Sequence, residues 1–130
     1  MASTDPNLGL TYGWTLGESG WNTSMDANLK RLGAVVGLSV KDRDLTTPPA
    51  SPVDGDRYIV PAAATGVWVG KTNQIAVRVA SAWEYYVPKV GWLCFIEDEV
   101  HVDIISLQDA PNFTSAFQRY HYRLPVEDLI

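Results

Sequence analysis

Apolar residues in the first third of the chain recur with the period of a helix. The gaps between them are four, three, four and four residues, which place them along one side of an α-helix. Thr23-Ser24-Met25-Asp26, where this stripe begins, has the form of a capping box. We therefore predict one amphipathic helix over residues 23–41, with Gly33 and Gly37 inside it. The stripe consists of Met25, Leu29, Leu32, Val36 and Val40.

From residue 57 onward, the pattern changes to short apolar runs separated by turn residues. A proline-rich stretch, residues 46–52, ends the helical region, because proline removes backbone N–H donors. The regular spacing of turns predicts an antiparallel β-meander. A helix and strands in separate blocks predict an α+β fold, in which the helix packs with the meander or against another subunit. The predicted strands are residues 57–60, 67–69, 74–79, 83–87, 92–96 and 100–105.

The two ends of the chain lack such patterns, and we expect both to contact other proteins. Residues 1–22 are glycine-rich and predict an irregular N-terminal lead that is poorly ordered in the free chain. Residues 108–130 predict a C-terminal arm, helical or extended, that lies on a neighbouring protein or folds back on its own sheet. Residues 23–107 are left as the helix-plus-sheet domain. The predicted docking residues are Trp14, Trp21, Met25, Leu29, Leu32, Val36, Phe113, Phe117, Tyr120, Leu129 and Ile130.

Composition and charge narrow the class of protein. The chain has 130 residues, five tryptophans and a formal net charge of −5, and its longest basic run is Lys30-Arg31. Phosphate recognition needs clustered Lys and Arg, so we expect no nucleic-acid binding. The first residues lack the regions of a signal peptide, and no apolar run has the length of a membrane span. We therefore expect a soluble protein made in the cytoplasm.

Residue types that carry chemistry are few. His101 and His121 lack a second His or Cys at metal-ligand spacing. Cys94 is the only cysteine, which excludes an intrachain disulfide, and its apolar neighbours predict a buried side chain. Residues 97–99, three consecutive acids, predict a solvated hairpin tip, and residues 54–56 predict a turn. We expect no catalytic residue, no cofactor and no metal.

Aromatic residues in the later strands allow two interpretations. Aromatic side chains on a small sheet can stack on sugar rings, so residues 83–92 are compatible with a glycan-binding module. The alternative, which burial favours, is that Trp83 and Tyr85 face the core and Tyr86 faces water.

Several motifs, taken in order, resemble a known family. The segments are WTLGESGWN (14–22), MDANL (25–29), VKDRDL (40–45), TPPASP (47–52), GDRYIV (55–60) and ATGVW (64–68). Over residues 8–103 the chain is similar to an uncharacterised bacteriophage domain, the domain of unknown function 2793. That domain recurs near the N-termini of phage tail fibres and tail spikes and in head spikes of gene-transfer agents. It has no assigned chemistry.

The resemblance implies a structural virion protein, an anchoring or adaptor component of a tail fibre or tail spike in the tail or baseplate. Its expected partners are other tail or baseplate proteins. Fibres and spikes of this kind are commonly three-fold, so the resemblance implies a homo-oligomer, with a homotrimer favoured. The alternatives are a capsid head fibre or decoration protein, and a glycan-binding module that contacts the host surface.

Overall fold

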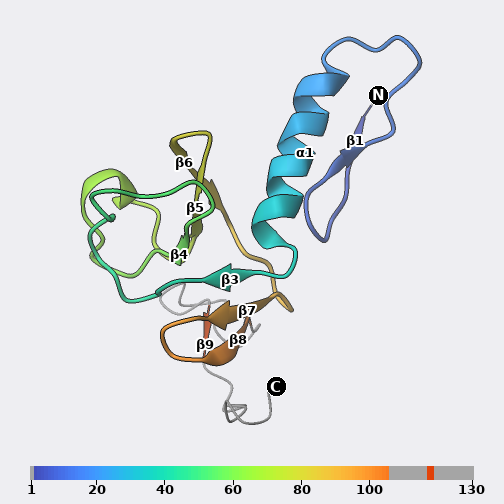
Figure 1. Ribbon diagram of the computed structural model, residues 1–130. Helices are drawn as coiled ribbons and strands as arrows, with labels where there is room; N and C mark the ends of the chain where they lie inside the picture. The colour runs from blue at the N-terminus through green and yellow to red at the C-terminus, as the bar shows by residue number, and fades with distance from the viewer. Residues whose placement is uncertain (1, 106–116, 119–130) are drawn as a thin grey trace. The chain divides into compact units, whose positions relative to one another are not determined.

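The computed structural model describes residues 2–105 and 117–118. These residues form one α-helix, one 3-10 helix and short β-strands, so the predicted α+β class is confirmed (Figure 1). The chain divides into two compact units, Met1–Val36 and Gly37–Ile130. We call them the N-terminal unit and the C-terminal unit and describe each by itself. The packing of the helix on a sheet stays a prediction.

Helix α1 spans Trp21–Val35 in the N-terminal unit. Gly20 precedes it in a left-handed conformation, with φ 84°, and no side chain caps the first turn, so the predicted capping box is wrong. The helix also ends earlier than the predicted residue 41. Gly37 takes a φ of 61°, which glycine adopts without strain, and strand β3, Ser39–Val40, follows. No described helix is long and apolar enough to cross a lipid bilayer.

The N-terminal lead contains a small β-hairpin. Strand β1, Ser3–Thr4, pairs antiparallel with β2, Thr11–Tyr12. The Asp5 carboxylate organises the connection by accepting hydrogen bonds from the backbone N–H groups of Leu8 (2.6 Å) and Gly9 (3.2 Å). The bond from Leu8 contributes most to lowering the pKa of Asp5. The prediction of an irregular lead is therefore wrong for these residues.

The C-terminal unit contains two sheets in place of the one predicted meander. The first has the antiparallel order β4-β5-β6, with bounds Arg57–Ile59, Ile75–Val79 and Ala82–Tyr86. The second has the order β3-β7-β8-β9, in which β3 runs parallel to β7. Strands β7, β8 and β9 are antiparallel and span Leu93–Ile96, His101–Ile105 and Phe117–Gln118. The sequence pattern located β4, β5, β6, β7 and β8 but not β3 or β9, and it carries no information on how the strands divide between sheets.

Strand β3 leads directly into a link between the two sheets. The Phe95 N–H donates to the Leu38 carbonyl at 3.0 Å, within the pairing of β3 with β7. Immediately after β3, the Lys41 N–H donates to the Arg57 carbonyl at 2.8 Å, and the Ile59 N–H donates to the Asp42 carbonyl at 3.1 Å. Residues 38–42 therefore bond first to one sheet and then to the other.

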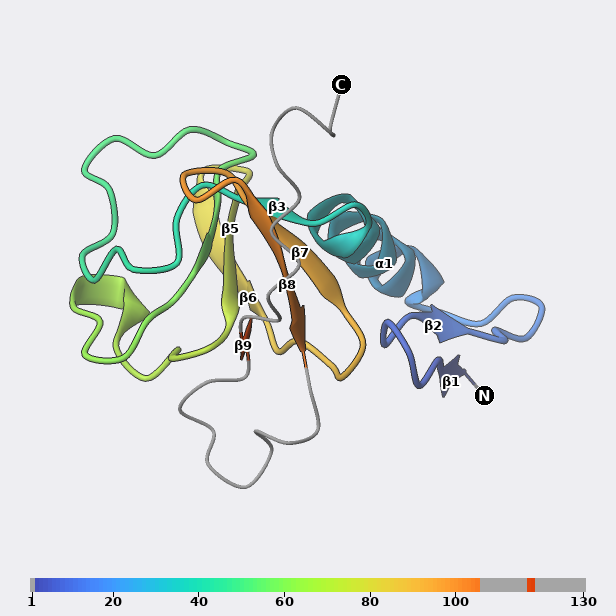
Figure 2. The same ribbon diagram turned by 90° about the horizontal axis from the view of Figure 1, so that it is seen from below.

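A 3-10 helix, η1, occupies Gly66–Trp68, where we predicted a strand. Gly66 has a φ of 61°, so the backbone favours glycine at this position, whereas a Cβ there would only make ordinary contact with Pro48 at 3.5 Å. Figure 2 shows η1, drawn in green, within the loop that leads into β5. This turn directs the Trp68 side chain into the core, where it is fully buried.

The core of this part of the C-terminal unit is aromatic. Trp68 contacts Tyr58 and Trp83, each with a ring-centroid distance of 5.4 Å. Trp83 and Tyr85 pack against this buried cluster, as predicted. The prediction that Tyr86 faces water is wrong: Tyr86 is buried, and its hydroxyl reaches the Glu84 carboxylate at 2.9 Å. A satisfied hydroxyl allows a tyrosine to be buried on the opposite face of the same strand.

The C-terminal arm is described only at β9. Phe117 and Gln118 pair with Ile105 and Ile104 of β8, so the arm is extended at this point and the helical interpretation is wrong there. The other predicted docking residues of the arm, which are Phe113, Tyr120, Leu129 and Ile130, lie outside the described residues.

Candidate interaction surface

Helix α1 is joined to the hairpin by one asparagine side chain. Asn28 is buried, and its Oδ1 accepts a hydrogen bond from the Thr11 N–H at 2.8 Å. Its Nδ2 donates to the Thr11 carbonyl at 2.7 Å. The amide therefore replaces a neighbouring strand on the outer edge of β2. This contact fixes which side of α1 faces the hairpin.

The apolar stripe of α1 lies next to Asn28 on the helix surface. With 3.6 residues per turn, its centre is about a quarter turn or less from Asn28. Trp21, Leu29 and Val36 are 52%, 58% and 59% exposed. Met25 and Leu32 are half-buried, as is Trp14 in the lead. The structure thus brings five of the predicted docking residues together on one face, and Trp14 is not on the helix.

A tight turn before α1 displays a leucine that the sequence did not single out. The Glu18 carboxylate accepts hydrogen bonds from the N–H and the hydroxyl of Thr15, at 2.9 and 3.1 Å, and the Glu18 N–H donates to the Thr15 carbonyl at 3.0 Å. The bond from the Thr15 N–H contributes most to lowering the pKa of Glu18. Gly17 has a φ of 77°. Leu16, at the tip, is fully exposed.

The sequence did contain a signal for this turn. Glycine supplies the positive φ that tight turns require, and Gly17 stands between Thr15 and Glu18, two residues whose side chains can form hydrogen bonds. The turn is built from its own residues, so it holds Leu16 in place without help from a core. We call Thr15 to Glu18 the Leu16 turn.

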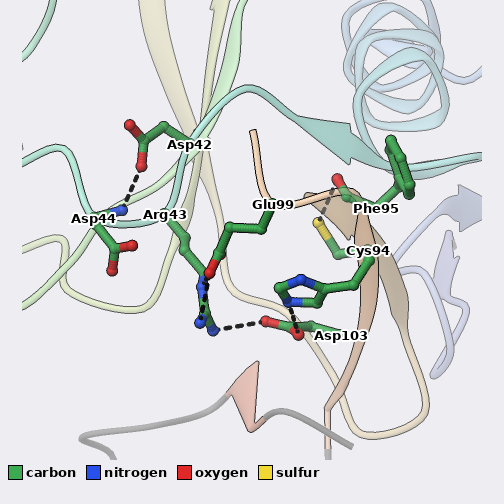
Figure 3. Close-up of polar contacts among 8 residues, drawn as sticks. Asp42, Arg43, Asp44, Cys94, Phe95, Glu99 and Asp103 are labelled. Atoms are coloured by element: carbon green, nitrogen blue, oxygen red, sulfur yellow. Dashed lines mark hydrogen bonds and ion pairs between the residues drawn. The ribbon is translucent and has the colours of Figure 1, made fainter. Parts of the chain in front are cut away.

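An ionic cluster in the C-terminal unit is the other notable group of polar side chains (Figure 3). Arg43 follows β3 and reaches both the turn of the β7–β8 hairpin and strand β8. Its Nη1 donates to the Asp103 carboxylate at 2.9 Å, and its Nη2 donates to Glu99 at 3.2 Å, with a further bond from Nε to Glu99. Asp103 is fully buried. The arginine thus neutralises a buried charge that would be costly alone.

His101 completes this cluster. Its Nε2 lies 2.9 Å from Oδ1 of Asp103, but the two atoms are not aligned for a hydrogen bond. Burial opposes the charge of Arg43, yet the hydrogen bond to Glu99 and the charges of Asp103 and Glu99 raise its pKa. Sequence reasoning missed Arg43, because its partners lie 56 and 60 residues away.

Carboxylates surround the cluster without forming a recognisable metal site. Asp98 lies at the hairpin tip, and burial followed by the charges of Asp42 and Glu99 raises its pKa. Figure 3 shows Asp42 accepting a bond from the Asp44 N–H at 2.7 Å, and the charge of Asp44 also contributes to raising the pKa of Arg43. Among residues 2–105 and 117–118, no group of three His, Cys, Asp or Glu side chains could hold a metal ion.

Cys94 lies opposite Asp103 in the β7–β8 register and is fully buried, as predicted. Burial and, secondly, the charge of Asp103 raise the pKa of the thiol to about 12. The thiolate is the nucleophilic form, so this side chain is an inert part of the core at neutral pH.

The aromatic residues considered for glycan binding already have partners. The Arg78 guanidinium lies over the Trp83 ring, 5.6 Å from its centroid, and the Lys71 ammonium lies over the Tyr85 ring at 4.9 Å. The Tyr85 hydroxyl donates to the Val67 carbonyl at 3.0 Å. These cations cover ring faces that a sugar would need. Glycan binding stays a prediction with no contact in its favour.

The fold and this surface define a small α+β domain with apolar side chains displayed on its N-terminal unit. Residues 25–107 match the family described as "Protein of unknown function (DUF2793)". The chain therefore belongs to this family, which confirms the family resemblance seen in the sequence. No curated protein and no solved structure matches the chain. The matched residues include most of α1 and both sheets of the C-terminal unit, whereas the β1–β2 hairpin and the Leu16 turn precede them.

Proposed function

We propose that this chain is a structural protein of a bacteriophage virion, acting in the tail as an anchoring or adaptor component for a fibre or spike. Membership of the family supports the proposal, together with the resemblance of its motifs to domains of phage tail fibres and tail spikes. The proposal includes self-association and contact with other tail or baseplate proteins. A capsid head fibre or decoration protein is the alternative within the same class.

The observation that carries the docking role is the Leu16 turn. A fully exposed leucine contributes nothing to the stability of the free chain, but its burial on a partner is worth about 1.5–3 kcal/mol. Because hydrogen bonds between Thr15 and Glu18 already fix the turn, little conformational entropy is lost on binding. Tyr12, 54% exposed, lies at the end of β2 just before the turn and extends the apolar surface.

A second argument comes from the small core of the N-terminal unit. Among residues 2–36, three side chains are buried, and one of them is the polar Asn28; the other two are Ala34 and Val35. A unit of this size rarely folds on such a core alone. A further apolar surface would stabilise it, and a partner in the particle would supply one.

The test is incorporation of variant chains into phage particles. We expect Leu16→Asp to leave the melting temperature of the purified chain unchanged, since the side chain is fully exposed, and to lower incorporation at least tenfold. The matched control is Val53→Asp, which alters an apolar residue that is 66% exposed in the C-terminal unit and should incorporate normally.

Separate analysis of heads and tails decides between the two virion roles. Wild-type chain in tails supports the anchoring role, whereas chain in heads without tails favours the decoration role. Absence from both fractions, or normal incorporation of Leu16→Asp, would contradict the docking argument.

A further inference from the structure

Strand β6 lies at the edge of the β4-β5-β6 sheet. The N–H of Arg78 in β5 donates at 2.8 Å to the carbonyl of the residue just before β4, so Arg78 bonds away from β6. Because neighbouring residues of a strand bond to opposite sides, Val77 bonds to β6, where Glu84 lies opposite it. By the same alternation, the N–H and carbonyl groups of Trp83 and Tyr85 point outward, and no described residue bonds to them.

This edge lacks the features that usually protect an edge strand from pairing. Natural edge strands often carry lysine, proline or a bulge, which keep other strands away. Strand β6 contains neither lysine nor proline, and its residues pair with β5 in a continuous register. The outer side of β6 is therefore open to a further strand.

Two positive charges lie over the side chains of Trp83 and Tyr85. The Arg78 guanidinium is 5.6 Å from the centroid of the Trp83 ring, and the Lys71 ammonium is 4.9 Å from that of the Tyr85 ring. Both cations are half-buried, and within residues 2–105 and 117–118 neither contacts a carboxylate. On a chain with a net charge of −5, such a pair selects an anionic partner.

The neighbouring carboxylates are engaged elsewhere. Asp56, just before β4, is bound by the Lys41 ammonium at 2.6 Å. Glu84 follows Trp83 in β6, so its side chain projects on the opposite face, where it accepts a hydrogen bond from the Tyr86 hydroxyl at 2.9 Å. Neither acid neutralises the two cations.

We propose that β6 accepts an extended acidic segment of another protein as a further antiparallel strand. The outward N–H and carbonyl groups of Trp83 and Tyr85 bond to two residues of that segment, which lie two positions apart. Those two residues project on the face that carries Arg78 and Lys71, so both are Asp or Glu. The residue between them projects beside Glu84 and is not acidic.

The dimensions of a strand match the two charges. Trp83 and Tyr85 are two positions apart, about 7 Å along the strand, and an added strand has the same repeat at about 5 Å from β6. An Asp or Glu side chain spans that separation, and cations already held on aromatic rings lose little conformational entropy on binding. The surface lies in the C-terminal unit, so the inference goes beyond the docking role of the Leu16 turn and does not rest on it.

A second copy of β6 is a poorer occupant of this edge. Antiparallel pairing through Trp83 and Tyr85 places the two-fold axis at Glu84, so Glu84 of one copy lies beside Glu84 of the other. The same pairing brings Arg78 of each copy toward Lys71 of the other. Like charges opposite one another destabilise a pair of strands, whereas an acidic segment turns both contacts into attractions.

Titration of the full-length chain with short end-capped peptides tests the charge pattern. The peptide TVEVEVT, with glutamates at alternate positions, should bind with a dissociation constant on the order of 100 µM. The peptide TVVEEVT has the same composition, but its adjacent glutamates project on opposite faces, so it should bind at least about fivefold more weakly.

Variants of the two cations test their part in binding. Lys71→Gln and Arg78→Gln should each weaken binding of TVEVEVT about three- to tenfold, with the melting temperature as the fold control. If Arg78→Gln unfolds the chain, Lys71→Gln alone decides. Lys89→Gln, the matched control, removes the same charge from an exposed lysine beyond β6 and should bind as the wild type does.

Hydrogen exchange followed by NMR tests the addition of a strand. The amides of Trp83 and Tyr85 should exchange rapidly in the free chain and become protected at saturating TVEVEVT. The Glu84 amide, which bonds to β5, should be protected in both states and serves as the internal control. N-methylation of the two glutamates removes the donors that face β6 and should abolish binding, whereas N-methylation of the valine between them should not.

Three results would overturn the proposal. Equal binding of the two peptides would show attraction without a register. Binding that leaves the exchange of Trp83 and Tyr85 unchanged, with oligogalacturonate binding as tightly, would show an electrostatic site for any polyanion. Protection of these amides that grows with chain concentration, without peptide, would make a second copy the occupant. None of these results bears on incorporation of Leu16→Asp chains into particles, so the two proposals fail separately.

Discussion

Replacing Arg43 by methionine removes the partner of the fully buried Asp103 while keeping a long apolar side chain. Breaking a buried ion pair from one side costs about 3–5 kcal/mol, because it leaves a charge without compensation. Glu99, the other partner of Arg43, is partly exposed to solvent, so the lower end of that range applies. We expect a loss of about 3 kcal/mol in the free energy of unfolding. For a domain of roughly this size that corresponds to a fall in melting temperature of about 12–24 °C.

Urea unfolding followed by tryptophan fluorescence measures this loss, with Lys41→Met as the matched control. Lys41 contacts Asp56 at 2.6 Å and is 52% exposed. Asp56 is buried but keeps the hydrogen bond from the Val53 N–H at 2.9 Å, so the removal of Lys41 should cost less than the removal of Arg43. The double variant Arg43→Met/Asp103→Leu should recover at least half of the loss, because no unpaired buried charge remains at Asp103. A single-variant loss no larger than that of Lys41→Met, or no recovery in the double variant, would refute the reasoning.

Three further predictions concern a hydrogen-bonding, a thiol and a carboxyl group. Asn28→Ala leaves the N–H and carbonyl of Thr11 without their partners, each worth about 1–3 kcal/mol, and should abolish hydrogen-exchange protection of the Thr11 amide. Cys94 should not react with a thiol reagent until urea unfolds the chain. Because the pKa of its thiol is raised from 9.0 in the unfolded chain to about 12 in the folded one, the neutral thiol favours the folded state, and the free energy of unfolding should fall as the pH rises above 9.0. The hydrogen bond with Lys41 contributes most to lowering the pKa of Asp56. The ionised Asp56 therefore stabilises the folded chain above the unfolded pKa near 3.8, and this stabilisation is lost as the pH falls below that value. Asp56→Asn should flatten the acid limb of a plot of unfolding free energy against pH.

Local patterns predicted the elements of this fold better than their ends or their arrangement. The stripe from Met25 to Val36 located α1, because periodicity extends over several turns and survives local exceptions. Its ends were misplaced because the left-handed glycines Gly20 and Gly37 decide them, and a glycine in a sequence does not reveal its φ. Val40 kept the period of the helix although it belongs to β3.

Contacts between distant parts of the sequence could not be predicted. Arg43 stands in a run of alternating charges that resembles a solvated turn, and only the fold brings it to Glu99 and Asp103. Tyr86 follows Tyr85 directly, so alternation placed it on the solvent side, but β6 packs on both faces, with Tyr86 buried on one and Trp83 and Tyr85 partly buried on the other. The Leu16 turn, in contrast, depends on residues three positions apart and was available from the sequence.

Residues 38–42 also determine how the chain would bear mechanical tension. A pull along the backbone at Gly37 runs into β3, whose hydrogen bonds to β7 and then to β4 lie across the direction of the strand. Such a force shears these bonds together instead of opening them one at a time, so rupture requires several to fail at once. Chain tension arriving from the N-terminal unit would therefore be shared by both sheets of the C-terminal unit before either begins to unravel.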